Sequence, residues 1–404
     1  MKRAYIILGL GYGDEGKGLA TDYFCRTSVK PLVIRFNGGH QAGHTVTTID
    51  GLSHVCSNFG SGTLRGVPTY WSSYCTFSPA YFLDEFRQLP VNPLIYIDNQ
   101  CPVTTHYDVL YNRAIETSRG KNRHGSCGVG FGATVIRHNY DSLKLKVEDI
   151  FKPEIHKRKL SNIREYYKKK INAETVFEFE AFDHDREDVL ALGYVDKLLE
   201  LIAEKTITIV NEKQMFKNES WQTFIFEGAQ GILLDIESGV YPYVTKSNTT
   251  SKNALEMLRR NFSPSIRKEI CYVTRAYLTR HGAGPFDYNE SDLLLANAAT
   301  ETNTYNPYQG EFKTGYLSLD LLNKSLKIDE QYVNDLNKSL IITCLDQVDS
   351  NNLPILSGNK LITINYKELV RLLNGKFLNC IYSFSSCSEN IHGDISQWKN
   401  DEIC

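Results

Sequence analysis

The sequence predicts an α/β fold with a central, mostly parallel β-sheet flanked by helices and a P-loop-like phosphate loop. Three observations predict it. Residues 5–8 form a short apolar run that ends at a glycine, residues 17–28 favour a helix, and residues 32–36 form a second apolar run. Strand, glycine-rich loop, helix and strand within about 35 residues make a βαβ unit, in which the strands are parallel.

Further apolar runs at 94–97, 224–226 and 340–342 predict more core strands, each ending near polar or glycine-rich residues. Ligands of parallel sheets gather at the carboxyl ends of the strands. We therefore expect the functional residues at these strand ends.

Residues 151–222 are charged and helix-favouring, with basic runs at 157–159 and 168–170. Such runs can bind nucleic acid or phosphate. Acidic residues follow at 178–185, which favours a solvated helical face instead. We expect residues 1–404 to form a single domain that carries this segment as a helical, charged insertion.

Charge and composition exclude several classes of protein. The chain has 45 basic and 47 acidic residues, a balance that argues against nucleic-acid and membrane-surface partners. Its start is too poor in apolar residues for a secretory signal, and no apolar run approaches the ~18 residues of a transmembrane helix. The ten cysteines form no CxxC pair, so we expect reduced thiols in a cytoplasmic protein.

The glycine loop at 11–18 reads GYGDEGKG, between the first strand and the helix. Backbone amides and a helix N-terminus make such a loop a phosphate site. Residues 11–16 match GxGxxG, but a dinucleotide site needs an acidic residue after the second strand, where this chain has Asn37. Residues 11–17 match GxxxxGK, but Gly18 replaces the Ser or Thr of a P-loop. Asp14, Glu15 and Lys17 favour an active site that handles charge over a dinucleotide oxidoreductase.

The second loop, at 38–45, reads GGHQAGHT and follows the second strand. His40 and His44 are four residues apart, a spacing that ligates zinc on a helix. Glycines in the loop argue against a helix, and a histidine beside phosphate-binding glycines is better suited to act as a general acid or phosphate donor.

Together these two loops resemble the adenylosuccinate synthetase family. Three more blocks match that family in the same order, at 227–235, 241–250 and 282–286, with weaker matches at 314–317 and 345–346. The resemblance implies a homodimeric enzyme that joins IMP to aspartate at the expense of GTP, with Mg²⁺. In that reaction an aspartate removes the N1 proton of IMP, the 6-oxygen attacks the γ-phosphate, and the amine displaces the phosphoryl group.

The resemblance assigns the catalytic roles. Asp14 is expected to be the base and a magnesium ligand, and Gly43 to offer its carbonyl to the same ion. His44 is expected to be the general acid at the transferring phosphoryl group, and Lys17 to neutralise its charge. Gln230 is expected to hold the 6-oxygen.

It also implies two binding sets. Asp346 is expected to pair with guanine, and Ser383 and Ser385 to complete the base pocket. The full nucleotide-binding set is Gly13, Glu15, Gly16, Gly18, Gly43, Thr45, Asp346, Ser383 and Ser385. The substrate-binding set is Gln41, Cys127, Thr245 and Lys313.

The sequence departs from the family where the second substrate binds. The family has a run of arginines before the segment at 314–317, whereas this chain has one cation there, Lys313, and an acid, Glu311. A dicarboxylate such as aspartate needs matching cations, usually bidentate arginines. Arg275 and Arg280 are candidate replacements, and Arg137 is the candidate for the arginine that the family sends across its dimer interface.

Three hypotheses remain. The first is the IMP–aspartate ligase, which makes adenylosuccinate. The second is a paralogue with the same phosphoryl activation but a different amine or purine nucleotide, including the phage-type synthesis of 2-aminoadenylosuccinate. The phage branch has Ser in place of the catalytic aspartate, so Asp14 argues against it. The third is a catalytically silent nucleotide-binding regulator, which would not need Asp14, Lys17, His44 and Gln230.

Overall fold

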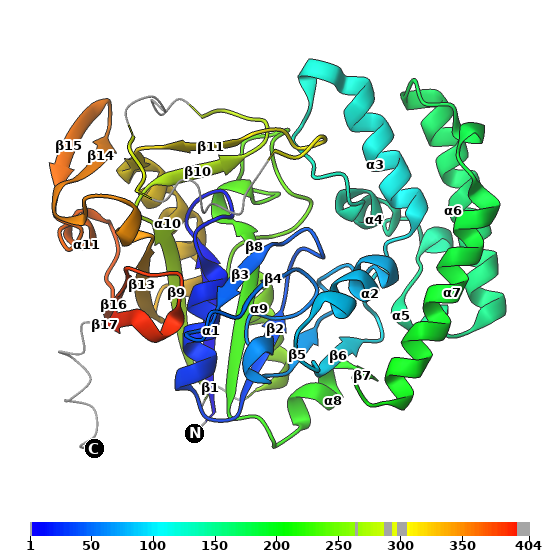
Figure 1. Ribbon diagram of the computed structural model, residues 1–404, viewed down its shortest axis with the longest axis horizontal. Helices are drawn as coiled ribbons and strands as arrows, with labels where there is room; N and C mark the ends of the chain where they lie inside the picture. The colour runs from blue at the N-terminus through cyan, green and yellow to red at the C-terminus, as the bar shows by residue number, and fades with distance from the viewer. Residues whose placement is uncertain (1, 263–265, 287–292, 297–304, 394–404) are drawn as a thin grey trace.

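A ten-stranded sheet runs through the centre of the computed structural model, which describes residues 2–262, 266–286, 293–296 and 305–393 (Figure 1). The strand order is β17-β16-β13-β9-β1-β8-β2-β5-β6-β7. Its strands are β1 (Arg3–Gly9), β2 (Pro31–Arg35), β5 (Thr69–Trp71), β6 (Ile95–Asp98), β7 (Ile207–Val210), β8 (Thr223–Gly231), β9 (Arg267–Arg275), β13 (Asn337–Thr343), β16 (Asn379–Ser383) and β17 (Ile391–Gly393).

Neighbouring strands are parallel throughout this sheet, except that β17 runs antiparallel to β16. The central strands are apolar on both faces because helices cover both. The predicted fold class is therefore confirmed. Each of the five predicted strands overlaps an observed one, although 32–36 ends one residue beyond β2 and 94–97 begins one residue before β6.

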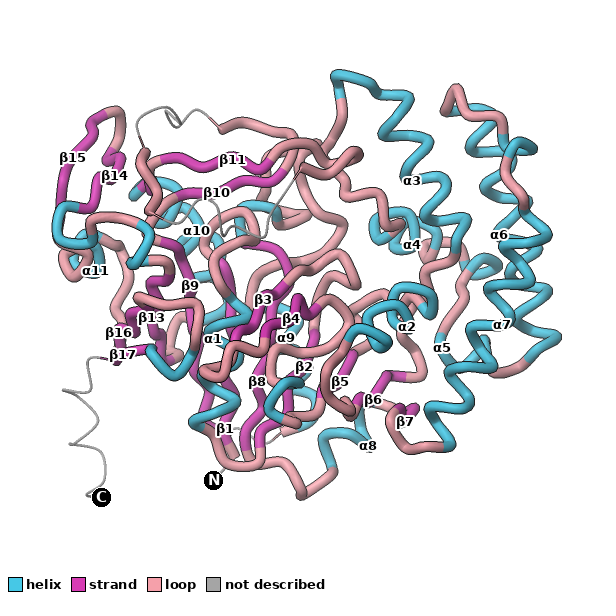
Figure 2. The backbone as a smooth tube through the Cα atoms, viewed as in Figure 1, coloured by secondary structure: helices cyan, strands magenta, loops and turns pink. Residues whose placement is uncertain are grey.

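The helices flank this sheet, as Figure 2 shows in cyan around the magenta strands. They are α1 (Lys17–Thr27), α2 (Pro79–Gln88), α3 (His106–Arg119), α4 (Phe131–Arg137), α5 (Val147–Ile150), α6 (Pro153–Glu174), α7 (His184–Ala203), α8 (Glu212–Lys217), α9 (Lys252–Asn261), α10 (Leu319–Val333) and α11 (Leu369–Leu372). On one face, Met257 of α9 and Leu322 of α10 join the largest apolar cluster. On the other face, Leu19 and Phe24 of α1 pack against the central strands.

Three small sheets complete the described part of the chain. They are β3–β4 (His44–Thr47 and Ser53–Cys56), β10–β11 (Leu278–His281 and Phe312–Gly315), and β12–β14–β15 (Leu317–Ser318, Leu353–Ser357 and Lys360–Ile364). Figure 1 shows the β10–β11 pair across the top of the central sheet, on the side where β8 ends.

The charged segment at 151–222 forms α6, α7, β7 and α8, with α6 and α7 side by side at one end of the molecule (Figure 1). Its strand β7 extends the central sheet by pairing with β6. The basic runs lie on α6, where Lys159 pairs with Asp149 and Lys168 pairs with Glu180, each at 2.6 Å. These ion pairs fit the predicted solvated helical face.

Arg137 does not face a partner subunit. Its guanidinium is fully buried, donates through Nε to Asp108 at 2.9 Å, and donates to the carbonyls of Val103 and Leu143. The prediction that Arg137 crosses a dimer interface is therefore wrong, because every one of these partners lies inside its own chain.

No helix among the described residues is long and apolar enough to cross a lipid bilayer. The cysteines within those residues form no disulfide with one another.

Candidate active site

Both glycine loops open into one cavity of about 680 Å³. The reason is topological: β1, β8 and β2 are adjacent in the sheet, so the loops that follow them meet at the same edge. The predicted residues that line the cavity are Gly13, Asp14, Gly16, Lys17, Gly18, Gly43, His44, Thr45, Asp346 and Ser385.

The first loop is stabilised from within by Glu15. Its buried carboxylate accepts hydrogen bonds from the amides of Gly11 at 3.0 Å and Gly13 at 2.6 Å. It also pairs with Lys17 Nζ at 2.8 Å, and Lys17 donates to the Gly13 carbonyl at 2.6 Å. Glu15 thus shapes the loop, and of this pair only Lys17 lines the cavity.

Gly18 explains why this loop departs from a P-loop. A Cβ atom at Gly18 would lie 2.9 Å from the Cβ of His44 and 3.1 Å from the carbonyl oxygen of Thr45. A serine or threonine would therefore push the second loop away. The glycine lets His44 approach the phosphate loop, which brings the two predicted catalytic loops together.

Asp14 lies at the tip of the first loop and lines the cavity. Burial raises the pKa of its carboxyl group, against the opposing pull of Arg275. Arg275, at the end of β9, donates through Nε to the backbone carbonyl of Asp14. A carboxylate with a raised pKa is a better proton acceptor, which suits a general base.

His44 begins β3 and is oriented by Glu227 of β8. The Nδ1 atom of His44 lies 2.6 Å from Oε1 of Glu227, and the amide of Ser61 donates to Oε2 of Glu227 at 3.1 Å. Burial works against ionisation of Glu227, but the charge and hydrogen bond of His44 lower its pKa to about 2. Burial lowers the pKa of His44. The ionised Glu227 therefore holds the proton on Nδ1 and leaves Nε2 for the cavity.

Sequence reasoning missed the role of Glu227, although it lies in a block that was matched to the family. The available signal was a carboxylate directly after the buried apolar run at 224–226. Arg275 and Ser61 had no comparable signal as partners of the catalytic groups, because their contacts span distant parts of the chain.

Gln230 adopts a left-handed backbone, with φ of 66°. It packs against the first loop: a Cβ atom at Gly13 would lie 3.3 Å from the Cα of Gln230. A left-handed conformation costs a non-glycine residue roughly 1–2 kcal/mol, and such strain concentrates at functional sites. Its position beside Gly13 fits the predicted role in holding a substrate atom near Asp14, although Gln230 does not line the cavity itself.

The far end of the cavity carries the predicted base pocket. Asp346 follows Cys344, which is also left-handed with φ of 56°, and accepts a hydrogen bond from Gln347 at 2.8 Å. Ser385 lines the cavity, whereas Ser383 is fully buried and donates to the carbonyl of Ser385 at 2.7 Å. Ser383 therefore supports the loop that presents Ser385.

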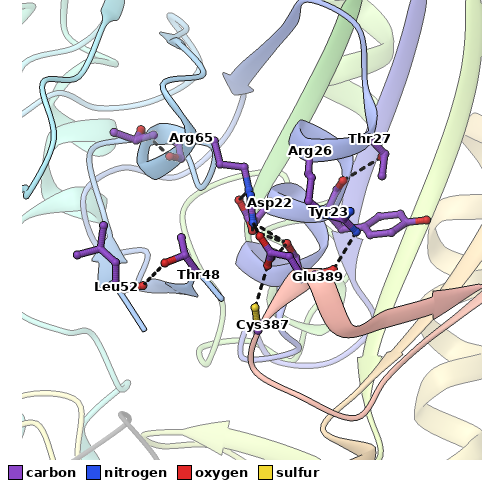
Figure 3. A network of polar contacts seen from close by, with 12 residues as sticks. Asp22, Tyr23, Arg26, Thr27, Thr48, Leu52, Arg65, Cys387 and Glu389 are labelled. Atoms are coloured by element: carbon purple, nitrogen blue, oxygen red, sulfur yellow. Dashed lines mark hydrogen bonds and ion pairs between the residues drawn. The ribbon is translucent and has the colours of Figure 1, made fainter. Parts of the chain in front are cut away.

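A polar network ties this base-pocket loop to α1 (Figure 3). Arg65 donates through Nη2 to Asp22 of α1 at 2.7 Å, to Ser388 at 3.0 Å and to Glu389 at 2.6 Å. The chain just beyond Ser385 is thus joined to the helix that the phosphate loop opens.

The predicted substrate residues lie outside this cavity. Both polar side-chain atoms of Gln41 are buried and have no hydrogen-bond partner among the described residues. The same is true of Oγ1 of Thr76 and Nδ2 of Asn248. Gly38 and Gly39 allow this crowding, since a Cβ at Gly39 would lie 3.0 Å from Oε1 of Gln41. Buried polar groups are rarely left unsatisfied, so this cluster is suited to a polar ligand.

Cys127 and Thr245 lie in two other loops. Burial raises the pKa of the Cys127 thiol to about 11, so it is a neutral side chain. Thr245 donates through its amide to the carbonyl of Leu234 at 2.8 Å.

Lys313, the last predicted substrate residue, lies on β11 opposite Arg280 of β10. It is not among the residues that line the cavity. Arg280 is buried, with its guanidinium 4.2 Å from the Tyr12 ring and hydrogen bonds to the carbonyls of Ala283 and Pro285. Of the two candidate replacement arginines, Arg275 lines the cavity and Arg280 does not.

The donor set fits Mg²⁺. Asp14 and Gly43 both line the cavity, and together they offer carboxylate and carbonyl oxygens. Magnesium is commonly held by one or two carboxylates together with substrate phosphates and water. Among the described residues no cluster of three or more His, Cys, Asp or Glu side chains could hold a metal, so substrate oxygens would complete the ligand set.

Comparison with known proteins gives one family. A sequence model of adenylosuccinate synthetase matches residues 6–361. The adenylosuccinate synthetase of Psychrobacter sp. (strain PRwf-1) is 30% identical over 355 residues, covering 86% of this chain and 80% of the relative. That of Vibrio parahaemolyticus serotype O3:K6 is 32% identical over 372 residues, covering 88% and 80%.

Two solved structures share the fold. Adenylosuccinate synthetase from Plasmodium falciparum superposes with a TM-score of 0.74 and 18% identity over 97% of this chain and 99% of that one. The succinoaminodeoxyadenylate synthetase of cyanophage S-2L, bound to dGMP and dATP, gives 0.63 and 15% over 97% and 95%. From the family model and the curated relatives, the chain belongs to the adenylosuccinate synthetase family, a family of GTP-binding carbon–nitrogen ligases of purine biosynthesis.

Proposed function

We propose that this chain activates the 6-oxygen of IMP with the γ-phosphoryl group of GTP and then joins an amine to C6. The observation that carries the proposal is the convergence of Asp14, Lys17 and the His44–Glu227 pair on one cavity. These groups supply a base, a fixed positive charge and an oriented imidazole, which are the parts that phosphoryl transfer to a weak oxygen nucleophile requires.

In the first step Asp14 accepts the N1 proton of IMP, and the electron pair moves onto the 6-oxygen. That oxygen bonds to the γ-phosphorus, the bond from phosphorus to the bridging oxygen breaks, and GDP leaves with the electron pair. Lys17 and His44 act on the charge of the transferring group. The raised pKa of Asp14 supports its role as the base.

In the second step a neutral amine nitrogen bonds to C6. The bond from C6 to the 6-oxygen breaks, phosphate leaves with that oxygen and the electron pair, and the nitrogen releases one proton. Phosphate is a far better leaving group than the carbonyl oxygen it replaces, which is the purpose of the first step.

The nucleotide-binding residues are assigned to two parts of the cavity, one for the base and one for the metal ion. Asp346 is proposed to accept hydrogen bonds from guanine, with Ser385 beside it, and Asp14 with the Gly43 carbonyl to hold Mg²⁺. When bound, the ion would offset the charge of the phosphates. The orphaned polar atoms of Gln41 support a polar substrate in the second loop.

Aspartate is the amine that the sequence resemblance implies, and its product would be adenylosuccinate. The second candidate keeps the activation chemistry and uses another amine or purine nucleotide, including the phage-type substrate. Glu311 in the cavity lining favours this candidate for the amine, whereas Asp14 argues against the phage-type purine. The cytoplasmic setting and the homodimer stay predictions.

The test follows the oxygen atom. The protein is incubated with IMP labelled with ¹⁸O at the 6-position, GTP, Mg²⁺, ammonium and a pool of amino acids, and released phosphate is analysed by mass spectrometry. Label in phosphate, with equimolar GDP, is the expected result. GDP with unlabelled phosphate would mean that water attacks GTP directly, and would overturn the proposal. Absence of GDP would favour the silent regulator.

A further inference from the structure

A second cavity, of about 400 Å³, lies among the helices at one end of the molecule. Its lining comes from α2, α3, α6 and α7 and from the segments that lead into α2 and α3, and we call it the helix pocket. Figure 1 shows these helices at the end of the molecule away from the β10–β11 pair. None of the described residues lines both this pocket and the catalytic cavity. Its volume is typical of pockets that hold small molecules.

The wall of the helix pocket is mostly apolar. Leu110 of α3, Ile150 of α5 and Leu160 of α6 are buried and line it. Phe182 and Tyr194 add two aromatic rings on the side of α7. Protein interiors are normally close-packed, and atoms around an empty space lose dispersion contacts. A ligand with flat apolar faces would restore these contacts.

Two buried polar side chains in the wall have no use within the fold that the structure describes. His156 is 4% exposed, and its Nδ1 atom is buried without a hydrogen-bond partner among the described residues. Ser78, also 4% exposed, precedes α2 but makes no side-chain cap hydrogen bond to it. Burial lowers the pKa of His156, so its neutral ring offers one donor and one acceptor. Because buried polar groups are rarely left unpaired, the pocket is suited to a ligand with polar atoms at its edge.

The charges in the wall favour an amino group over a phosphate group. Glu187, in the first turn of α7, is half-buried, lines the pocket and has no ion pair with any residue that the structure describes. Asp84, the other acid in the described lining, pairs with Arg87 at 2.8 Å. Arg113 is the one lysine or arginine of that lining, and its Nε donates to the carbonyl of Gly128 at 3.0 Å. A carboxylate without a partner accepts hydrogen bonds from an amino group and repels a phosphate.

We propose that the helix pocket binds a flat heteroaromatic amine of about nucleoside size. Its rings lie against Phe182 and Tyr194, its amino group donates to Glu187, and a polar atom of its edge pairs with His156. An aminopurine nucleoside such as adenosine has this chemistry, whereas a nucleotide adds a phosphate that the two acids repel. The inference does not rest on the proposed function, because the described lining of the helix pocket is separate from that of the catalytic cavity.

Two residues of the pocket wall also contact the predicted substrate loops. The ring of Tyr81 stacks on the ring of His40 in the second loop, with centroids 4.4 Å apart and an interplanar angle of 19°. Arg113 holds the carbonyl of Gly128, next to Cys127. A bound ligand that restricts Tyr81 and Arg113 would therefore restrict both loops, which makes the helix pocket an effector site.

Calorimetry of the full chain with adenosine, inosine and AMP tests the ligand class. GDP and IMP are present throughout, so that adenosine does not compete for an empty catalytic cavity. We expect adenosine to bind at least about tenfold more tightly than inosine, which lacks the amino group, and than AMP, which carries the phosphate. No binding of adenosine up to about 1 mM, or equal binding of all three compounds, would overturn the proposal.

Two variants with matched controls locate the site. Ala191→Trp fills the pocket and should abolish adenosine binding, whereas Ala173→Trp, on the exposed face of α6, should leave it unchanged. Glu187→Gln, which removes a charge without changing the packing, should abolish the preference for adenosine over inosine, and the exposed Glu165→Gln should retain it. Unchanged binding by Ala191→Trp would place adenosine elsewhere, and an unchanged preference in Glu187→Gln would remove Glu187 from the contact. Either result would overturn the proposal.

Hydrogen exchange tests the link to the substrate loops without any catalytic assay. Adenosine should slow amide exchange at 38–45 and 125–130 in the parent protein and have no such effect in Ala191→Trp. Binding without slower exchange at these loops would overturn the effector role.

Discussion

The two sides of the catalytic cavity are built differently. One side, called the activating side here, is formed by the loops after β1 and β2. Its buried ionisable groups are paired, Lys17 with Glu15 and His44 with Glu227. On the opposite side, the residue just before β11, Glu311, is exposed and has no ion pair among the described residues. The activating side is part of the core of the central sheet, whereas the opposite side lies beside the separate two-stranded sheet β10–β11.

This difference indicates which side of the cavity tolerates substitution and which side does not. A buried charge that loses its partner is strongly destabilising, so the activating groups constrain one another. An exposed charge beside a small sheet can be exchanged at little cost in stability. We infer that the activating groups are fixed by the fold, whereas residues on the opposite side can change without loss of the fold.

Asp14→Asn is expected to have the largest effect on the activating side. The amide cannot accept the N1 proton, so kcat should fall by about 10³-fold or more, within the range for loss of a general base. GTP affinity, measured by titration calorimetry, should change much less, because Lys17 and the loop amides remain. Turnover near that of the parent protein would show that another group is the base.

Glu227→Gln should come next, with effects on both rate and stability. The neutral side-chain amide of glutamine lacks the negative charge with which Glu227 fixes the proton on Nδ1 of His44. We therefore expect kcat to fall by about 10²-fold. Loss of charge-assisted hydrogen bonds should lower the free energy of unfolding by about 2 kcal/mol, measured in urea. Rescue of kcat by Glu227→Asp, but not by Gln, would separate orientation from packing. A variant with unchanged kcat would show that His44 is not oriented by Glu227.

The same pair predicts a pH dependence of stability. The pKa of Glu227 is lowered from 4.5 to about 2, so its contribution is complete above pH 4.5 and is lost as the pH falls towards 2. The pKa of His44 is also lowered, and the unfolded chain therefore binds more protons than the folded one once the pH falls below 6.5. Both groups make the folded protein less stable as the pH falls. The shift in the pKa of Glu227 corresponds to about 3 kcal/mol of unfolding free energy.

Urea unfolding between pH 3 and pH 7 measures this dependence. Stability should fall steadily as the pH is lowered, and Glu227→Gln should flatten the fall below pH 4.5. A variant that keeps the full acid slope would show that other carboxylates produce it.

Arg65→Lys should have a smaller effect, confined to the base end of the cavity. Lysine cannot reach Asp22, Ser388 and Glu389 together, so the loop beyond Ser385 should loosen. We expect the KM for GTP to rise about fivefold. The stability change should stay below about 1 kcal/mol because Arg65 and Glu389 are partly exposed and lysine keeps a positive charge beside the buried Asp22. An unchanged KM would show that the network does not support the base pocket.

Much of the fold could be predicted from the sequence because the main strands of the central sheet are apolar runs. The segments at 5–8, 224–226 and 340–342 are buried on both faces, and such runs are readable without a structure. The β10–β11 pair was not predicted as a pair. Its strands are short, half-buried and separated by thirty residues, so no local pattern joins them.

The candidate site likewise combines residues that the sequence indicates with contacts that it does not reveal. The sequence indicated Asp14, Lys17 and His44 as candidates because their loops are glycine-rich and follow predicted strands, and all three line the cavity. The contacts of Glu227 with His44 and of Arg275 with Asp14 join residues far apart in sequence, and no spacing rule reveals them. Arg137 was misread because an arginine that is paired inside a helical region with Asp108 looks the same, in sequence, as one on the surface.

The contacts of Arg65 join the two ends of the proposed triphosphate site in a way that bears on substrate selection. Asp22 belongs to the helix that follows the phosphate loop, and Ser388 and Glu389 belong to the segment that follows the base pocket. A base that fits the pocket would hold that segment in place, and the segment in turn holds the helix. The chain should therefore discriminate between nucleoside triphosphates through catalytic turnover as well as through affinity, because an ill-fitting base leaves the phosphate loop less firmly supported.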